Sequence, residues 1–212
     1  LIHDILRLSS RIKAVNKFKS FIRSSMNLTK KLNADELMNG KANNFDTYVC
    51  GSDQIWNPEI VNPDKKIDPI FFLSFAPNGA KKISYASSIG HHNFTNDEKK
   101  EVESLLQDFR TISTRESDGQ KKLQEILPNR EIHHVLDPTL LLSKKEWLET
   151  LDIKLQEPKE KYILLYTVPR TDLIKKAVEY FSKKLKLKVI AIDQMFFPIT
   201  KVDKHVRNAG PK

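Results

Sequence analysis

The sequence is poor in the residue types on which several classes of protein depend. Its 212 residues contain one cysteine, Cys50, which excludes an internal disulfide and a cysteine metal cluster. Only six glycines are present, and neither a Gly-x-Gly-x-x-Gly fingerprint nor a Walker phosphate loop occurs. Internal repeats and low-complexity segments are missing as well. No apolar run approaches the roughly 20 residues of a membrane-spanning helix. These absences leave an ordinary globular enzyme or binding module.

The first residues show neither an initiating methionine nor the pattern of a signal peptide. With the single cysteine, this predicts a protein of the reducing cytoplasm. The formal net charge of +9 raises the question of nucleic-acid binding. The lysines occur as scattered pairs without a stripe interleaved with aromatics, so we predict solvated faces and no nucleic-acid partner. A basic surface also suits anionic substrates and peripheral association with the inner face of a membrane.

Apolar segments of strand length alternate with helical segments along the chain. The opening segment has Ile12, Val15, Phe18 and Ile22 on one helical face, which predicts an amphipathic helix. Capping-box patterns open two later helices, at residues 95–98 and 143–146, and Ser117 or Asp118 is expected to cap another. The predicted strands lie at residues 45–50, 82–89, 111–114, 132–136, 162–168 and 188–192. This alternation predicts an α/β fold with parallel strands and right-handed crossovers.

A charged stretch at residues 156–161 is typical of a linker, and the strand–helix–strand rhythm restarts after it. We therefore predict two Rossmann-like halves. Residues 1–157 would form the N-terminal domain, and residues 158–212 would begin a second domain that is incomplete.

The loop after the first predicted strand is the most informative segment. An apolar run stops at Gly51, and Ser52, Asp53, Gln54 and Asn57 follow within six residues. Polar loops at strand ends are the usual ligand sites of α/β sheets. Asp53 could orient a sugar hydroxyl or act as a base, or it could hold the loop by bonding backbone N–H groups.

Trp56, in the same loop, could stack on a sugar ring or pack in the core with its N–H satisfied. Arg115 lies where a strand ends and a helix begins. Its guanidinium could grip a carboxylate or phosphate, or it could pair with Glu116 or Asp118. Asp137, before a proline, is expected to fix a turn.

Four of the six histidines form two adjacent pairs, at residues 91–92 and 133–134. Neighbours on a strand point to opposite faces, so we predict no metal site. Cys50 lies inside a predicted strand, where a buried small hydrophobe is expected rather than a nucleophile.

Several segments, in this order, resemble the polysaccharide pyruvyl transferase family. The most specific is Gly-Ser-Asp-Gln-Ile-Trp-Asn-Pro at residues 51–58. The supporting segments are Lys-Ile-Ser-Tyr-Ala-Ser-Ser-Ile-Gly at 82–90, Ile-Ser-Thr-Arg-Glu-Ser at 112–117, Asp-Pro-Thr-Leu-Leu-Leu at 137–142 and Glu-Trp at 146–147. The resemblance covers most of the chain from about residue 45 onward.

The resemblance implies a two-domain GT-B architecture with the active site in the cleft between the domains. It implies transfer of a pyruvyl group from phosphoenolpyruvate to a sugar of a cell-surface polysaccharide, giving a ketal and releasing phosphate. The donor is a substrate, and no cofactor is expected. The acceptor would be a saccharide or a lipid-linked glycan. Arg115 matches a family arginine expected at the donor site.

We take Arg115 and Asp53 as the candidate catalytic residues. The candidate substrate-binding residues are Gly51, Ser52, Gln54, Trp56, Asn57, Ser87, Glu116 and Asp137.

The chain departs from the family pattern at both ends. Family members open with a strand and a glycine-containing loop, and their second domain carries a Ser-Phe-His-Gly-like segment whose histidine is the expected general acid/base. The Asn-Ala-Gly-Pro segment at residues 208–211 resembles the approach to that segment, and none of the six histidines matches it. We therefore expect an inactive fragment of a pyruvyl transferase. A GT-B enzyme using a nucleotide sugar and a non-catalytic sugar-binding module are the alternatives.

Overall fold

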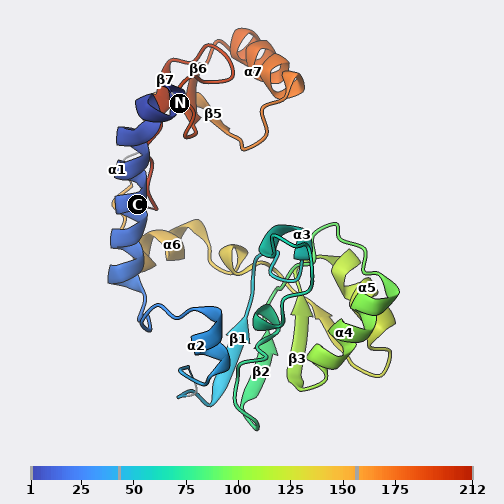
Figure 1. The fold of residues 1–212 in the computed structure, drawn as a ribbon. Helices are drawn as coiled ribbons and strands as arrows, with labels where there is room; N and C mark the ends of the chain where they lie inside the picture. Colours follow the sequence, from blue (N-terminus) through green and yellow to red (C-terminus); the bar gives the residue numbers. More distant parts are fainter. Residues whose placement is uncertain (1, 43, 156–157, 212) are drawn as a thin grey trace. The chain divides into compact units, whose positions relative to one another are not determined.

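The structure is a computed structural model that describes residues 2–42, 44–155 and 158–211 (Figure 1). Its internal contacts form two compact units. The central unit comprises Lys30–Glu146, and the terminal unit combines Leu1–Thr29 with Trp147–Lys212.

The central unit contains a parallel four-stranded sheet in the order β1-β2-β3-β4. The strands are β1 (Thr47–Cys50), β2 (Lys81–Ser84), β3 (Phe109–Thr114) and β4 (Ile132–His134). The helical segments are α2 (Ala34–Met38), α3 (Pro58–Val61), the 3-10 helices η1 (Pro69–Phe72) and η2 (Pro138–Leu140), α4 (Asn96–Leu106) and α5 (Ser117–Ile126). Because the strands are parallel and consecutive, their carboxyl ends meet at one edge of the sheet.

The core of the central unit lies between this sheet and its helices. α4 buries Val102 and Leu106 completely, and α5 does the same with Leu123. The predicted capping box at the start of α4 is confirmed, since Thr95 and Glu98 bond each other's backbone N–H.

Two details of the predicted elements are wrong. The strand expected over residues 82–89 ends at Ser84, because Ala86 takes a left-handed conformation with φ of 52° and breaks the extended chain. The residue that caps α5 is Glu116, which makes no side-chain capping bond, rather than Ser117 or Asp118.

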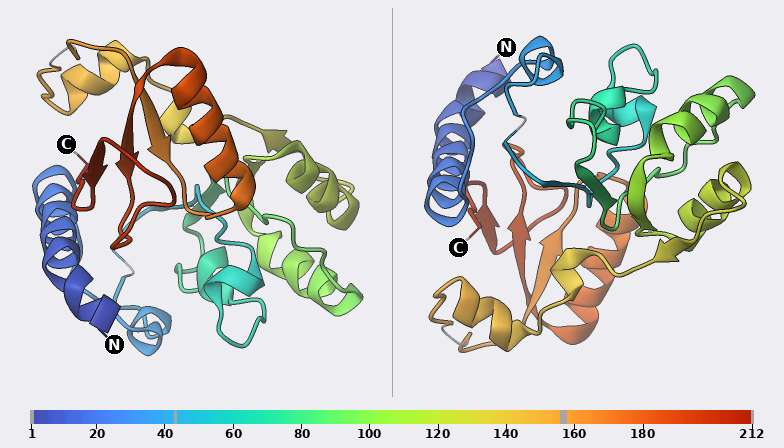
Figure 2. Two further views of the ribbon diagram at one scale, coloured as in Figure 1. Left: turned by 90° about the horizontal axis from the view of Figure 1, so that it is seen from above. Right: turned by 90° about the horizontal axis from the view of Figure 1, so that it is seen from below.

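The terminal unit contains a parallel three-stranded sheet in the order β5-β6-β7. Its strands are β5 (Tyr162–Tyr166), β6 (Lys188–Ile192) and β7 (Lys204–Val206). The helix α7 (Asp172–Leu185) connects β5 to β6 and lies beside the sheet (Figure 2). Its residue Val178 packs with Leu165 of β5 and with Val189 and Ala191 of β6. α1 (Ile2–Ser25) also belongs to this unit, and α6 (Lys144–Thr150) spans the boundary between the units.

The α/β class with parallel sheets is confirmed, whereas the GT-B arrangement and the incompleteness of the second half stay predictions. The boundary at residue 158 also stays a prediction, and residues 156–157 of the expected linker lie outside the described residues. The opening helix forms, but Ile12, Val15 and Phe18 remain 40–49% exposed on it. None of the described helices combines the length and hydrophobicity needed to cross a bilayer.

Candidate functional site

The loop after β1 folds closely over the end of β2. Gly51 has φ of +123°, and a Cβ atom there would lie 2.0 Å from the carbonyl oxygen of Tyr85, so no side chain fits. Backbone hydrogen bonds fix the rest of the loop. The N–H of Ser88 donates to the Asp53 carbonyl at 3.0 Å, and the N–H of Trp56 donates to the Ser88 carbonyl at 3.1 Å. The loop is therefore rigidly placed at the carboxyl edge of the sheet.

Trp56 is one of the most deeply buried residues of the central unit. Its side chain is 1% exposed and stacks on the Phe72 ring with centroids 5.3 Å apart. Its Nε1–H donates to the Phe71 carbonyl at 3.1 Å. This geometry favours the core-packing alternative over contact with a sugar ring.

Gln54 and Asn57 form an amide pair inside the loop. Asn57 Nδ2 donates to Gln54 Oε1 at 2.9 Å, while Asn57 Oδ1 accepts the N–H of Glu59 at 3.1 Å and caps α3. Gly90 makes room for the pair, because a Cβ atom there would lie 2.2 Å from Gln54 Oε1. The buried Asn57 thus positions the loop, and the half-buried Gln54 can still be reached from solvent.

Ser52 and Asp53 are the loop residues most open to a ligand. Ser52 is half-buried and Asp53 is exposed. Asp53 Oδ1 accepts the N–H of Gln54 at 2.7 Å, which is the backbone-holding role that the sequence left open. Among the described residues its second oxygen accepts no hydrogen bond, so that oxygen can also receive a ligand hydroxyl.

Ser87, the candidate from the second strand end, is fully buried. Its hydroxyl donates to the Cys50 carbonyl at 3.4 Å, and its backbone joins the end of β3 through the N–H of Arg115 at 3.2 Å. Ser87 therefore ties three strand ends together. Burial raises the pKa of the Cys50 thiol to about 12, which fits the predicted inert role of that residue.

Arg115 directly follows β3 and is held by two carboxylates. Its Nε donates to Glu116 Oε1 at 2.9 Å, and its Nη1 donates to Asp137 Oδ2 at 3.2 Å. The predicted pair with Glu116 is confirmed. The alternative partner Asp118 pairs instead with Lys122 at 2.8 Å. The Arg115 side chain is 28% exposed, and among the described residues its Nη2 donates no hydrogen bond, so this edge can still meet a ligand.

The acid–base properties of this cluster follow from its hydrogen bonds. Asp137 Oδ1 accepts from the Thr139 hydroxyl at 2.6 Å and from the Thr139 N–H at 2.9 Å. These bonds, with Arg115, lower the pKa of Asp137 to about 2. Asp137 also caps η2, so the predicted turn is confirmed. Glu116 and then Asp137 raise the pKa of Arg115 above its usual value, so the guanidinium is fully charged.

Glu116 is linked to the segment that follows β2 by Ser88, a residue that the sequence did not single out as a site residue. The hydroxyl of the fully buried Ser88 donates to Glu116 Oε1 at 2.8 Å and accepts the N–H of Gly90 at 3.0 Å. The other oxygen of Glu116 is buried and has no partner among the described residues.

A second pair of serines bridges β2 and β3. Ser84 Oγ donates to the Ser113 carbonyl at 3.1 Å and accepts the Ser113 N–H at 2.8 Å. Ser113 Oγ donates to the Ser84 carbonyl at 2.8 Å and accepts the N–H of Ala86 at 3.0 Å. The sequence signal for the roles of Ser84, Ser88 and Ser113 was the presence of small polar residues in and just after otherwise apolar strands.

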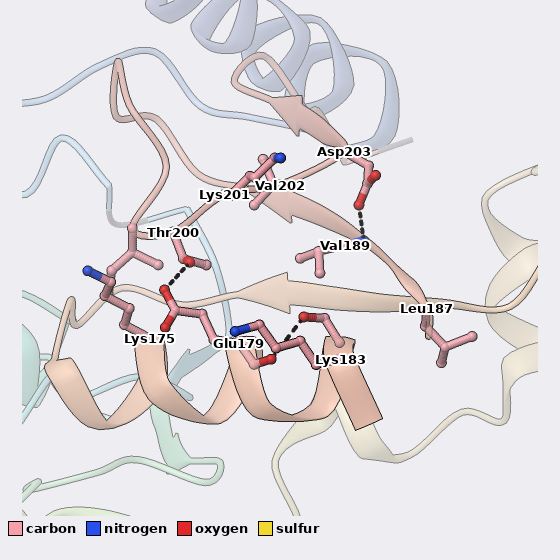
Figure 3. Close-up of a pocket in the computed structure, with 11 residues that line it drawn as sticks. Lys175, Glu179, Lys183, Leu187, Val189, Thr200, Lys201, Val202 and Asp203 are labelled. Carbon is pink, nitrogen blue, oxygen red and sulfur yellow. Dashed lines mark hydrogen bonds between the residues drawn. The ribbon is translucent and has the colours of Figure 1, made fainter. Parts of the chain in front are cut away.

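The chain's other polar clusters offer little for catalysis. Among the described residues, His, Cys, Asp and Glu side chains do not gather in groups of three or more suited to a metal ion. In the terminal unit, a hollow of about 580 Å³ lies between α7 and the segment leading to β7 (Figure 3). Thr200 Oγ1 donates there to Glu179 Oε1 at 2.7 Å, and the Val189 N–H donates to Asp203 Oδ2 at 2.8 Å. These groups already satisfy one another.

Comparison with known proteins gives one match. A family model described as polysaccharide pyruvyl transferase matches residues 3–206, nearly the whole chain. No curated protein and no solved structure matches it.

Proposed function

Because this chain belongs to the polysaccharide pyruvyl transferase family, we propose that it acts in the transfer of a pyruvyl group from phosphoenolpyruvate to a sugar of a cell-surface polysaccharide. Two sugar hydroxyls form C–O bonds to the enol carbon, phosphate leaves with one hydroxyl proton, and the methylene carbon takes the other. The product is a pyruvate ketal. We place this reaction in the cytoplasm, in a cleft of GT-B type.

The fixed orientation of Arg115 is the observation that carries this proposal. Its carboxylate partners occupy Nε and Nη1 and leave Nη2 for a ligand at the carboxyl edge of the parallel sheet. A guanidinium held in this way can meet the carboxylate or phosphate of the donor with little loss of conformational freedom.

The carboxylates around Arg115 also bear on the proposal. Glu116 and Asp137 outweigh one guanidinium in charge, so the cluster by itself does not favour a dianion. We propose that Arg115 orients the donor, and that further positive charge in the cleft supplies the remaining attraction. The second oxygen of Asp53 is suited to orient an acceptor hydroxyl.

The test is phosphate release from phosphoenolpyruvate by the full-length protein in the presence of candidate glycans. We expect release that depends on the acceptor. In Arg115→Lys, kcat/KM for the donor should fall by about 10- to 100-fold, because an ammonium group cannot reproduce the planar fork. Asp118→Asn removes a neighbouring charge that does not contact Arg115 and serves as the matched control.

Two results would count against the proposal. Turnover of a nucleotide sugar without phosphate release from any donor–acceptor pair would favour the alternative glycosyltransferase. Unchanged donor kinetics in Arg115→Lys would return Arg115 to a purely structural role.

A further inference from the structure

The terminal unit contains a cavity of about 660 Å³ at the carboxyl ends of its three strands. Ligands of open α/β sheets bind at this edge, and the volume is in the range of small-molecule sites. Apolar side chains form most of the wall, among them Phe18, Leu164, Tyr166, Ile192, Met195 and Val206. The cavity therefore suits a ligand with an apolar body.

A single arginine in this wall has unmet hydrogen-bonding capacity. Arg207 directly follows β7, and its Nη1 is buried without a hydrogen-bond partner among the described residues. The guanidinium carbon lies 5.0 Å from the centre of the Phe196 ring, a cation–π contact that orients the group without neutralising it. Within the described part of the chain, no carboxylate forms an ion pair with Arg207. A buried donor of this kind gains free energy when an acceptor reaches it.

The carboxylate in the wall does not compensate this charge, because it is already engaged elsewhere. Asp193 Oδ1 is 2.9 Å from His205 Nε2 and accepts the Met195 N–H at 2.8 Å. Its other oxygen lies 3.8 Å from Arg170 Nη1. The positive charge of Arg207 is therefore available to a ligand.

We propose that this cavity binds an amphipathic oxyanion, with the phosphate or carboxylate group on Arg207 and the apolar body against Leu164, Tyr166 and Ile192. The wall is continuous from the arginine to these side chains, so one small molecule can meet both. All the residues concerned belong to the terminal unit. The geometry of the site therefore rests on contacts within one unit.

The first experiment is isothermal titration calorimetry of the chain with a series of probes. The probes separate the contribution of the oxyanion group from that of the apolar body. We expect hexyl phosphate or hexanoate to bind more tightly than inorganic phosphate and than hexyl glucoside, which lacks the charge. Comparison of hexyl phosphate with hexanoate identifies the preferred oxyanion. Shortening the better probe from hexyl to butyl should weaken binding, by up to about fourfold per methylene.

The second experiment removes each half of the site. Arg207→Gln should weaken binding of the better hexyl probe about tenfold or more while leaving hexyl glucoside unchanged. Leu164→Asn, at a residue exposed enough to tolerate the change, should weaken the hexyl probe and leave inorganic phosphate unchanged. Lys204→Gln removes an exposed charge from β7, the strand that Arg207 follows, and serves as the control.

Thermal melting of each variant checks that the terminal unit remains folded. Equal affinity of Arg207→Gln and the wild-type chain for the hexyl probe would overturn the proposal. Binding of inorganic phosphate as tight as that of both hexyl probes would also overturn it, because the apolar wall would then contribute nothing. An Arg115→Lys variant should bind the hexyl probe normally, which separates this result from a failure of the proposed transferase function.

Discussion

The two sheets share a parallel topology but present opposite chemistry at their carboxyl edges. At the edge of the central unit, Arg115 and the serines at positions 84, 87, 88 and 113 are engaged with neighbouring protein groups. At the edge of the terminal unit, the wall is mostly apolar and Nη1 of Arg207 has no hydrogen-bond partner among the described residues. The first edge can orient a reacting group, whereas the second can gain affinity from a ligand that completes it.

The largest loss of stability in the central unit is expected from a substitution at Gly51. Gly51→Ala places a methyl group against the Tyr85 carbonyl and should destabilise the central unit by roughly 3 kcal/mol or more. Gly79→Ala is the matched control. Gly79 also has positive φ, at +86°, but a Cβ there meets nothing within 4 Å, so about 1 kcal/mol is expected. Urea unfolding measures both, and equal losses would show that the close approach is unimportant.

The pairing of polar groups is tested at Ser113. Ser113→Ala leaves the Ala86 N–H without its acceptor in a buried site and should cost about 1–3 kcal/mol. Ser84→Ala should cost a similar amount. In the double variant the losses should be close to additive, because the two hydroxyls make separate hydrogen bonds, each to backbone groups of the opposite strand. Urea unfolding measures all three variants, and a loss in the double variant well below the sum would contradict these separate bonds.

The smallest expected effect is the pH dependence due to Asp137. Its folded pKa of about 2 lies below the unfolded value near 3.9, so its contribution to stability is present above about pH 4 and lost as pH falls toward 2. The difference in unfolding free energy between wild type and Asp137→Asn should be constant from pH 5 to 7 and shrink below pH 4.

Asp108→Asn is the control, because its side chain is 83% exposed. It shows how far the loss of an aspartate charge alone changes the pH dependence of the unfolding free energy. A difference for Asp137→Asn that stays constant down to pH 2 would contradict the assigned hydrogen bonds.

Signals that act over a few residues allowed the fold to be predicted well. The capping bonds of Thr95 with Glu98 and of Ser143 with Glu146 are both present. The sequence did not predict β7, because this three-residue strand is too short for a periodicity signal. The sequence also did not predict that the apolar side chains of α1 would be half exposed. Hydrophobic periodicity identifies the apolar face of a helix but does not show which element, if any, packs against it.

The candidate site was predicted in part. The sequence placed Arg115 beside Glu116, but the Asp137 partner is 22 residues away and approaches only because β3 and β4 are neighbours in the sheet. Trp56 and Ser87 lie in or beside the loop that follows β1, but their burial depends on packing by η1 and β3, which residue type alone does not reveal.

The reciprocal bonding of Ser84 and Ser113 also has an evolutionary consequence. Each hydroxyl bonds the backbone of the other residue, and a backbone group stays in place whatever side chain its residue carries. A change at one position therefore leaves unsatisfied groups that a change at the other position cannot relieve. We expect relatives of this chain to keep a small hydroxyl-bearing residue at each of the two positions, whatever the other position carries.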